Sequence, residues 1–279
     1  MTAKTTIVSV AELAAHPEWR VFDCSHEISD PEAGAQAYAR EHIPGAVHAR
    51  METVLSGARS GANGRNPLCD PQTLAAWLGK AGVENRDQIV VYDRSNGAAA
   101  ARMWWSLRWL GHPAVALLDG GLATWKLARH AVVEEIPAFS QTTFAIQPDD
   151  TAHVDLDFIG SVLDKGTHLL IDARPDPKFH GIGETTDPRG GHIPGASNRP
   201  SSDNLGADGL FKSPTELRRE WLDMIGAAEP GQVVAYCGSG VSACHNLLAL
   251  EIAGLPGAKL YPGSWSEWCA VPERPIETE

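Results

Sequence analysis

The chain of 279 residues has few cysteines and little positive charge. It contains five cysteines, an odd number, and no two of them form a CxxC pair. We therefore expect neither a disulfide framework nor a zinc site. The formal net charge of -12 at pH 7 argues against nucleic acid or an anionic membrane as a partner, because both would be repelled.

Long hydrophobic runs are also missing. No apolar stretch approaches the roughly 20 residues that cross a membrane, and the start MTAKTTIVSVAELAAHPEW lacks the apolar core of a secretion signal. We therefore expect a cytoplasmic protein. The hydrophobic content of 43% and the charged content of 21% are ordinary for a globular chain, and the length accommodates two domains of about 130 residues.

The sequence contains a long internal repeat. The motif HIPGA occurs at 42–46 and again at 192–196, 150 residues later. An apolar run ends at Asp93 in the first half and at Cys237 in the second half, 144 residues later. A nearly constant offset over such a distance indicates a duplicated domain rather than a short solenoid repeat. Only the second copy carries a cysteine at this position.

Each half alternates short apolar runs rich in β-branched residues with helical patterns. This alternation predicts an α/β fold with two domains, each a mostly parallel sheet flanked by helices. Helices are expected to begin near Pro71 and near Ser213, where a cap and a proline suit a first turn. We place the domains at 1–138 and 153–279, joined by a polar linker at 139–152.

Cys237 opens the segment CGSGVSA, in which small residues separate a predicted strand from a predicted helix. Glycines in such a turn let backbone N–H groups surround the sulfur, and the helix N-terminus adds positive potential, so the thiolate form is favoured. Such a thiolate attacks a transferable sulfur, a phosphate or an arsenate. A cysteine phosphatase needs an arginine six residues later, where this chain has Ala243. A buried structural cysteine at a strand end is the competing interpretation.

The paired HIPGA motifs, LLDGGLATW, YPGSWSEW and CGSGVSACH together resemble the tandem-domain rhodanese superfamily of sulfurtransferases. The start CGSG is similar to the 3-mercaptopyruvate branch, whereas thiosulfate enzymes typically carry basic residues at the positions of Gly238 and Ser239. The resemblance implies a silent first domain, an active second domain and a persulfide on Cys237.

The resemblance also implies how the donor is bound. Arg189 matches one family arginine that binds the donor carboxylate, and Lys178 stands where the family has another. Arg174 is expected to form a structural ion pair instead. The loop residues that are expected to supply backbone N–H groups, and in one case a hydroxyl, are Gly238, Gly240, Val241 and Ser242.

A proton relay is a further implication of the resemblance. It would consist of Ser239, His42 of the first HIPGA motif and an upstream carboxylate, for which Asp30 is the best match. A structural role for His42 is the competing interpretation, and we prefer it for His192. Asp93 cannot act as a sulfur nucleophile and is expected to pack or form hydrogen bonds in a vestigial loop. Its replacement by alanine should change stability by no more than about 1 kcal/mol.

The expected activity is transfer of a sulfane sulfur from 3-mercaptopyruvate through Cys237 to a thiol, such as a reduced dithiol protein, or to cyanide. Thiosulfate:cyanide sulfurtransfer is the alternative within the enzymes. A non-enzymatic persulfide carrier or regulatory module is the alternative outside them. No metal and no organic cofactor is expected.

Overall fold

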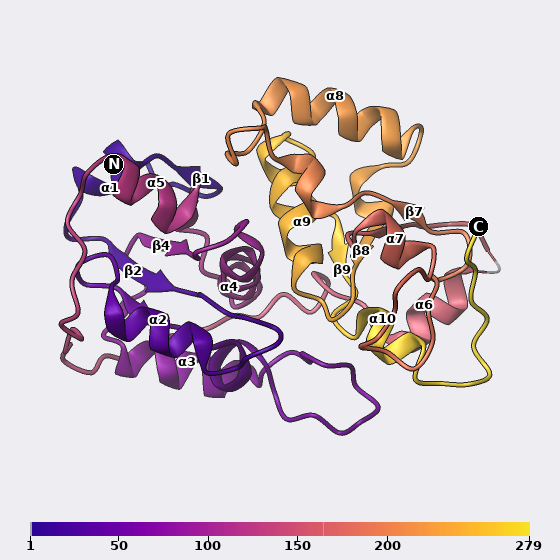
Figure 1. Ribbon diagram of the computed structural model, residues 1–279, viewed down its shortest axis with the longest axis horizontal. Helices are drawn as coiled ribbons and strands as arrows, with labels where there is room; N and C mark the ends of the chain where they lie inside the picture. Colours follow the sequence, from indigo (N-terminus) through magenta and orange to yellow (C-terminus); the bar gives the residue numbers. More distant parts are fainter. Residues whose placement is uncertain (1, 164) are drawn as a thin grey trace. The chain divides into compact units, whose positions relative to one another are not determined.

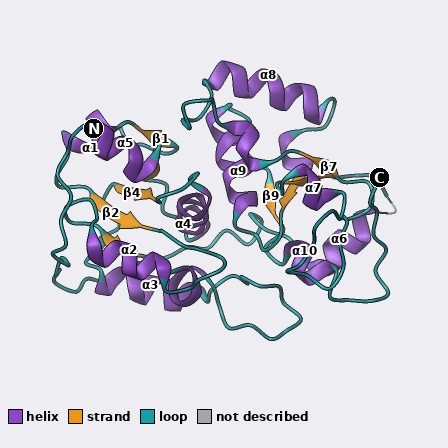
Figure 2. Cartoon of the chain, in the orientation of Figure 1, coloured by secondary structure: helices purple, strands orange, loops and turns teal. Residues whose placement is uncertain are grey.

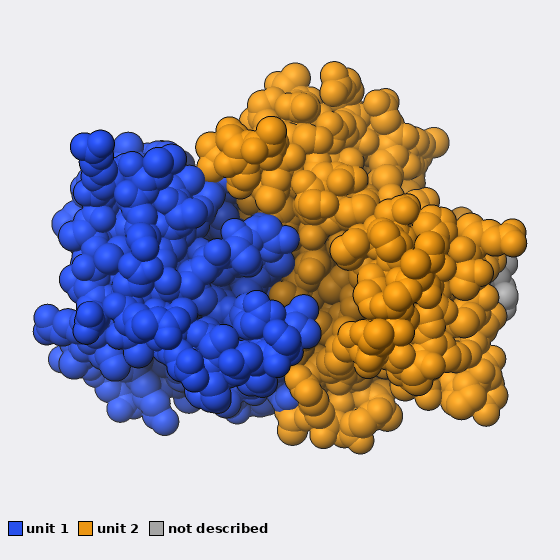
Figure 3. Space-filling model, viewed as in Figure 1, with its two compact units in different colours: residues 1–57, 68–149 blue, residues 58–67, 150–279 orange. Residues whose placement is uncertain are grey.

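The computed structural model describes residues 2–163 and 165–279. The chain forms two compact units, which Figure 3 shows in different colours. The first contains residues 1–57 and 68–149, and the second contains residues 58–67 and 150–279. The ten residues 58–67 therefore belong to the second unit, although their sequence neighbours on both sides belong to the first. No helix in the described part of the chain is both long and apolar enough to cross a membrane.

The first unit is built on a parallel five-stranded sheet in the order β1-β5-β4-β2-β3. Its strands are β1 (Ile7–Val8), β2 (Arg20–Asp23), β3 (Val47–His48), β4 (Ile89–Tyr92) and β5 (Val115–Leu118). Its helices are α1 (Val10–Ala14), α2 (Ala33–Arg40), the π-helical turn η1 (Met51–Leu55), α3 (Pro71–Lys80), α4 (Ala98–Trp109) and α5 (Gly121–Leu127).

Helices cover both faces of this first sheet (Figure 1). On one face Leu13 of α1 and Trp125 of α5 pack with Val90 and Tyr92 of β4. The central strand β4 is buried along its whole length, as expected for a parallel sheet between two helical layers.

The second unit repeats this plan with a parallel four-stranded sheet in the order β7-β6-β8-β9. Figure 2 shows its strands among the helices and loops. The strands are β6 (Leu169–Asp172), β7 (Ser197–Asn198), β8 (Val233–Tyr236) and β9 (Lys259–Leu260). The helices are α6 (Leu156–Leu163), α7 (Asp176–Phe179), α8 (Pro214–Ile225), α9 (Ser242–Ile252) and α10 (Ser264–Trp268), with 3-10 turns η2 (Ser201–Asn204) and η3 (Pro230–Gln232).

The predicted helix starts are confirmed. The Ser213 hydroxyl accepts a hydrogen bond from the backbone N–H of Glu216 at 3.2 Å, and Pro214 is the first residue of α8. In the first unit Asp70 plays the same part for α3, and Pro71 is its first residue. The two apolar strands end one residue earlier than expected, so Asp93 and Cys237 are the residues that immediately follow β4 and β8.

The two HIPGA motifs are held in the same way. The backbone N–H of Ile43 donates to the hydroxyl of Tyr92 at 3.1 Å, and that of Ile193 donates to the hydroxyl of Tyr236 at 3.2 Å. Each motif is thereby fixed to the strand that precedes the Asp93 or Cys237 position. The repeat in the sequence is thus a repeat in structure.

Candidate active site

Cys237 lies between the end of β8 and the loop that leads into α9, and it is 3% exposed. Its backbone N–H donates to the Ser264 hydroxyl at 3.1 Å, and its carbonyl accepts from the N–H of Trp265 at 2.9 Å. The next carbonyl, of Gly238, accepts from the N–H of Ser266 at 3.0 Å. The N-terminal turn of α10 therefore fixes the backbone on which the sulfur is carried.

Ser264 holds this position in an uncommon backbone conformation. Its φ is 56°, in the left-handed region that residues other than glycine seldom adopt. Its hydroxyl donates to the carbonyl of Tyr261 at 2.9 Å while accepting from Cys237, and the residue is fully buried. A side chain that makes two buried hydrogen bonds offsets the cost of the strained backbone.

The corresponding loop of the first unit shows what such a turn binds. The carboxylate of Asp93, 2% exposed, accepts four backbone N–H bonds. The donors are Ser95 (2.9 Å), Gly97 (3.0 Å), Ala99 (3.1 Å) and Ala100 (3.2 Å). Burial raises the pKa of this carboxyl, and these N–H groups act in the opposite direction. This loop of the first unit is therefore an anion-binding turn that the chain fills with its own carboxylate.

The two loops differ in one detail. The left-handed glycine is Gly97 in the first unit and Gly240 in the second, which are one position apart when Asp93 is matched to Cys237. Val241 precedes α9 with φ −93°, and Ser242 is the first residue of the helix. The second loop therefore has its left-handed residue one position earlier, and α9 begins at Ser242.

Residues 58–67 contribute two side chains to the Cys237 loop. The amide of Asn66 donates to the Ser239 hydroxyl oxygen at 2.9 Å. A Cβ atom built on Gly238 would lie 2.7 Å from Nη2 of Arg65, so Arg65 covers this glycine and would have to move if a side chain were present there. The guanidinium of Arg65 is ion-paired with Asp187.

Arg174 adds a second guanidinium beside the loop, with its Cδ 3.9 Å from the same built Cβ position. Nη2 of Arg174 donates to Asp172 at 2.6 Å, which confirms the expected ion pair, and the group stacks over Trp265. Burial works against the charge, but Asp172 outweighs it and the pKa of Arg174 is raised. Nη1 of this 6%-exposed residue has no hydrogen-bond partner among residues 2–163 and 165–279.

Arg189, expected to bind the donor carboxylate, is engaged elsewhere. Its three guanidinium nitrogens donate to backbone carbonyls of the segment that follows α10. These acceptors are Cys269 (3.0 Å), Val271 (2.6 Å), Pro272 (3.2 Å) and Arg274 (3.1 Å). An arginine has five N–H donors, and these contacts use at least one on each of its three nitrogens. Arg189 therefore holds the backbone of this segment in place.

Lys178 is likewise engaged. Its ammonium donates to the carbonyl of Gly183 at 2.6 Å and lies 3.4 Å from the carboxylate of Glu184. Glu184 also accepts the N–H groups of Thr186 and Asp187. Burial acts to raise the pKa of Glu184, but these N–H groups and Lys178 together hold it below its ordinary value. Lys178 therefore stabilises the loop before the second HIPGA motif.

The structure does not assemble Asp30 and His42 into a relay. The two ring nitrogens of the fully buried His42 lie 2.8 and 3.0 Å from the carbonyl oxygens of Tyr38 and Glu135. Asp30 is exposed, and its carboxylate accepts the backbone N–H of Glu32. Because both ring nitrogens of His42 face carbonyls, neither can accept a hydroxyl proton in this arrangement, so the geometry agrees with the competing structural interpretation.

His192 has the anchoring that we preferred for it, with Nδ1 donating to the carbonyl of Phe179 at 3.0 Å. The other cysteines are also buried. Burial raises the pKa of Cys69 and of Cys269 to about 11 and that of Cys24 well above its ordinary value. These three thiols are poor nucleophiles at neutral pH. Within the described residues no three His, Cys, Asp or Glu side chains are grouped to hold a metal ion.

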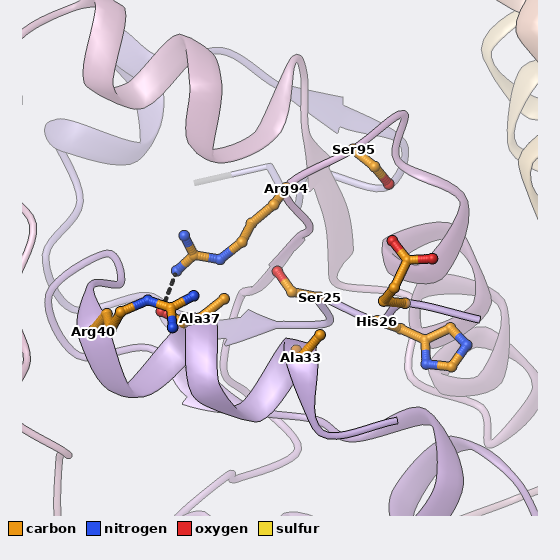
Figure 4. Close-up of a pocket in the computed structure, with 9 residues that line it drawn as sticks. Ser25, His26, Ala33, Ala37, Arg40, Arg94 and Ser95 are labelled. Carbon is orange, nitrogen blue, oxygen red and sulfur yellow. Dashed lines mark hydrogen bonds between the residues drawn. The ribbon is translucent and has the colours of Figure 1, made fainter. Parts of the chain in front are cut away.

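The first unit also contains a cavity of about 280 Å³ where β2 and β4 end (Figure 4). Arg94, which follows Asp93, donates to the carbonyl of Ala37 at 3.1 Å and is ion-paired with Glu41. Ser25 and Ser95 also line the cavity. Arginine side chains line the cavity but no cysteine does, and Asp93 stands at the position that Cys237 has in the second unit.

Sequence reasoning missed Arg65, Asn66 and Ser264. The only available signal was the presence of an Arg-Asn pair in the glycine-containing stretch 58–67, in the half that lacks the cysteine. Nothing in the order of residues along the chain connects that stretch to a loop more than 170 residues later.

The chain is a duplicated α/β protein in which Cys237 lies between a buried parallel strand and a helix N-terminus, with Asp93 as its counterpart in the first copy. The family model "Rhodanese-like domain" matches residues 6–128 and 159–271. The chain belongs to the rhodanese family, in two tandem copies.

Several relatives match over nearly the full length. A probable 3-mercaptopyruvate sulfurtransferase of Pseudomonas aeruginosa is 44% identical over 275 residues, covering 98% of this chain and 97% of the relative. A putative thiosulfate sulfurtransferase, SseB of Mycobacterium tuberculosis, is 36% identical, covering 97% and 96%.

Solved structures agree in fold. The 3-mercaptopyruvate sulfurtransferase from Leishmania major has a TM-score of 0.85 at 29% identity, covering 95% of this chain and 74% of that chain. SseA from Escherichia coli, a 3-mercaptopyruvate sulfotransferase, has a TM-score of 0.80 at 32% identity, covering 95% and 100%. The two-domain α/β prediction is confirmed, and the chain is a sulfurtransferase.

Proposed function

We propose that this sulfurtransferase takes the sulfur of 3-mercaptopyruvate onto Cys237 as a persulfide and passes it to a thiol or to cyanide. The choice of donor rests on the net charge of the two arginines that lie beside the loop and of their carboxylate partners. Both guanidinium groups there, of Arg65 and Arg174, are already paired with carboxylates of Asp187 and Asp172. Such pairs offer directed N–H donors with little net charge, which suits a monoanionic carboxylate better than the thiosulfate dianion.

In the first half-reaction the Cys237 thiolate attacks the sulfur of 3-mercaptopyruvate. An S–S bond forms, the C–S bond breaks, and its electron pair remains on carbon as the enolate of pyruvate. The proton of the donor thiol then neutralises the enolate, which leaves pyruvate and the Cys237 persulfide anion. By analogy with the first unit, whose loop N–H groups bind the Asp93 carboxylate, we assign the N–H groups that follow Cys237 to stabilising the charge on sulfur.

Ser239 assists without a histidine partner. Because Asn66 donates to the Ser239 oxygen, the hydroxyl proton of Ser239 remains available for donation to a substrate oxygen. We assign it to the oxygen that becomes negative as the enolate forms. This role requires only a hydrogen bond and replaces the relay through His42 and Asp30.

In the second half-reaction the acceptor attacks the outer sulfur of the persulfide. A thiolate, for example of a reduced dithiol protein, leaves as its own persulfide, and cyanide leaves as thiocyanate. In both cases the bonding pair of the S–S bond returns to Cys237 as thiolate. No electron donor beyond the acceptor itself is needed.

Intact-mass analysis after incubation with donor alone tests the nucleophile. One sulfur, about 32 mass units, should be added to Cys237, and Cys237→Ser should lose both the added mass and turnover with every acceptor. A fully active Cys237→Ser variant would overturn the mechanism. Rates with 3-mercaptopyruvate and thiosulfate at equal low concentration test the donor.

Thiosulfate is the second candidate donor, and one observation favours it. Arg65 places a cation beside Gly238, where thiosulfate enzymes typically carry a basic side chain of the loop itself. Faster turnover of thiosulfate than of 3-mercaptopyruvate would select this candidate.

A further inference from the structure

The segment 58–67 is attached at three points to the surroundings of Cys237: to α10, to the segment before the second HIPGA motif and to the Cys237 loop itself. The backbone N–H of Arg65 donates to the Ser266 hydroxyl at 3.0 Å, and its guanidinium is paired with Asp187. Asn66 donates to Ser239. These contacts fix the position of the Arg65 guanidinium against Gly238, and the absence of a side chain on that glycine is what leaves it room.

The ion pair of Arg65 is asymmetric in exposure. The Arg65 side chain is 29% exposed, whereas that of Asp187 is only 6% exposed. Arg65 is therefore the more accessible member of the pair, and Asp187 is the buried partner that neutralises it.

Arg174 is the second arginine beside this glycine, with its Cδ 3.9 Å from the built Cβ position. Its Nε and Nη2 are used by Asp172 and by the carbonyl of Gly191, and its buried Nη1 is left without a partner among the described residues. A buried donor of a charged group that lacks a partner is costly unless a ligand supplies the acceptor. In contrast, Arg189 contacts four backbone carbonyls.

We propose that Arg65 and Arg174 bind the anionic end of the sulfur donor, and that Asp187 limits the charge of the donor by neutralising Arg65. The recognition site for the donor is then supplied from 58–67 and from the end of β6, while Arg189 and Lys178 stabilise surrounding loops. The carboxylate as ligand rests on the proposed function. The anion site itself does not, because it applies equally to a sulfonate.

Steady-state kinetics of four variants test this assignment. Arg65→Gln should raise KM for 3-mercaptopyruvate about tenfold or more, with a smaller change in kcat, because a charge-assisted hydrogen bond to the bound donor is lost. Arg65→Lys should restore part of the affinity, since it keeps the charge but not the fork. Arg219→Gln, an exposed change of the same charge on α8, is the matched control and should leave KM unchanged.

Asp187→Asn tests the role of the neutralising carboxylate. It removes one negative charge with little change of shape, so kcat/KM for thiosulfate relative to 3-mercaptopyruvate should rise about tenfold. An unchanged ratio would refute the role of Asp187, and an unchanged KM in Arg65→Gln would refute the anion site.

The second half-reaction separates binding from mere stabilisation of the loop. Enzyme whose Cys237 persulfide has been preloaded with inorganic polysulfide should transfer sulfur to cyanide at the wild-type rate in Arg65→Gln. A parallel loss in this step would mean that Arg65 only supports the fold, and the assignment would fail. If the wild-type enzyme does not turn over 3-mercaptopyruvate, and Arg65→Gln raises KM for thiosulfate instead, the proposed donor is overturned. The anion site is then retained.

Discussion

Replacing Asp93 by alanine is expected to destabilise the first unit far more than a vestigial residue would. The change removes the acceptor of four backbone N–H groups in a site that is 2% exposed. A hydrogen bond to a charged group contributes about 1.5–3 kcal/mol, but water entering the vacated space and relief of the buried charge offset part of the loss. We expect a loss of about 3–4 kcal/mol, which is larger than the value of about 1 kcal/mol expected from the sequence, because of these four hydrogen bonds.

Asp93→Asn is the matched variant. It preserves shape and one acceptor oxygen but turns an amide NH2 toward the remaining N–H donors, so about half of the loss is expected, roughly 2 kcal/mol. Urea unfolding followed by tryptophan fluorescence measures the difference. Because a two-domain chain need not unfold in one step, amide exchange of peptides from β4 and α4 assigns the loss to the first unit.

The same two variants should turn over donor at the wild-type rate at temperatures where the first unit is folded. A loss of less than 1 kcal/mol in Asp93→Ala would refute the reasoning, since it would mean that four buried N–H groups are satisfied equally well without the carboxylate.

Three further changes test the rest of the site. Ser264→Ala should lower kcat severalfold, because the N–H of Cys237 loses its acceptor. Ser264→Gly should lower kcat less, because glycine also relieves the backbone strain. Equal kcat values in the two variants would contradict the strain argument. Arg189→Met should cost about 2–4 kcal/mol in urea unfolding with little effect on donor KM, and a KM effect without loss of stability would restore its role in binding. Glu184→Gln tests the pH dependence of stability. The pKa of Glu184 is lowered on folding, so its contribution is present above the ordinary glutamate range and disappears as pH falls through the lowered value. Unfolding midpoints of wild type and Glu184→Gln should therefore differ at pH 7 and converge in acid, and a constant difference would count against this.

The fold could be predicted because the repeat and the alternation of apolar runs with helical patterns are visible along the sequence. Neither requires knowing which distant segments contact each other. The two HIPGA motifs and the runs before Asp93 and Cys237 predicted two parallel sheets with helices on both faces, as observed. Cys237 could be singled out for the same reason, since a strand, a glycine turn and a helix follow one another along the chain.

The surroundings of Cys237 could not be predicted, because they depend on contacts between distant segments. Motif position alone suggested Arg189 and Lys178 as donor ligands, yet both side chains donate to backbone carbonyls, and Lys178 also to Glu184. Conversely, nothing local distinguishes Arg65 from other surface arginines. Whether an arginine can bind a ligand depends on how many of its N–H groups already donate to acceptors in the folded chain.

The order of synthesis gives the segment 58–67 a further consequence. Arg65 leaves the ribosome 201 residues before its partner Ser266, and Asn66 leaves 173 residues before Ser239. The first sheet is fully translated long before either partner exists, so its central strands can pair while this loop still lacks its contacts. A nascent or truncated chain that ends before residue 239 therefore holds Arg65 and Asn66 without either of these partners.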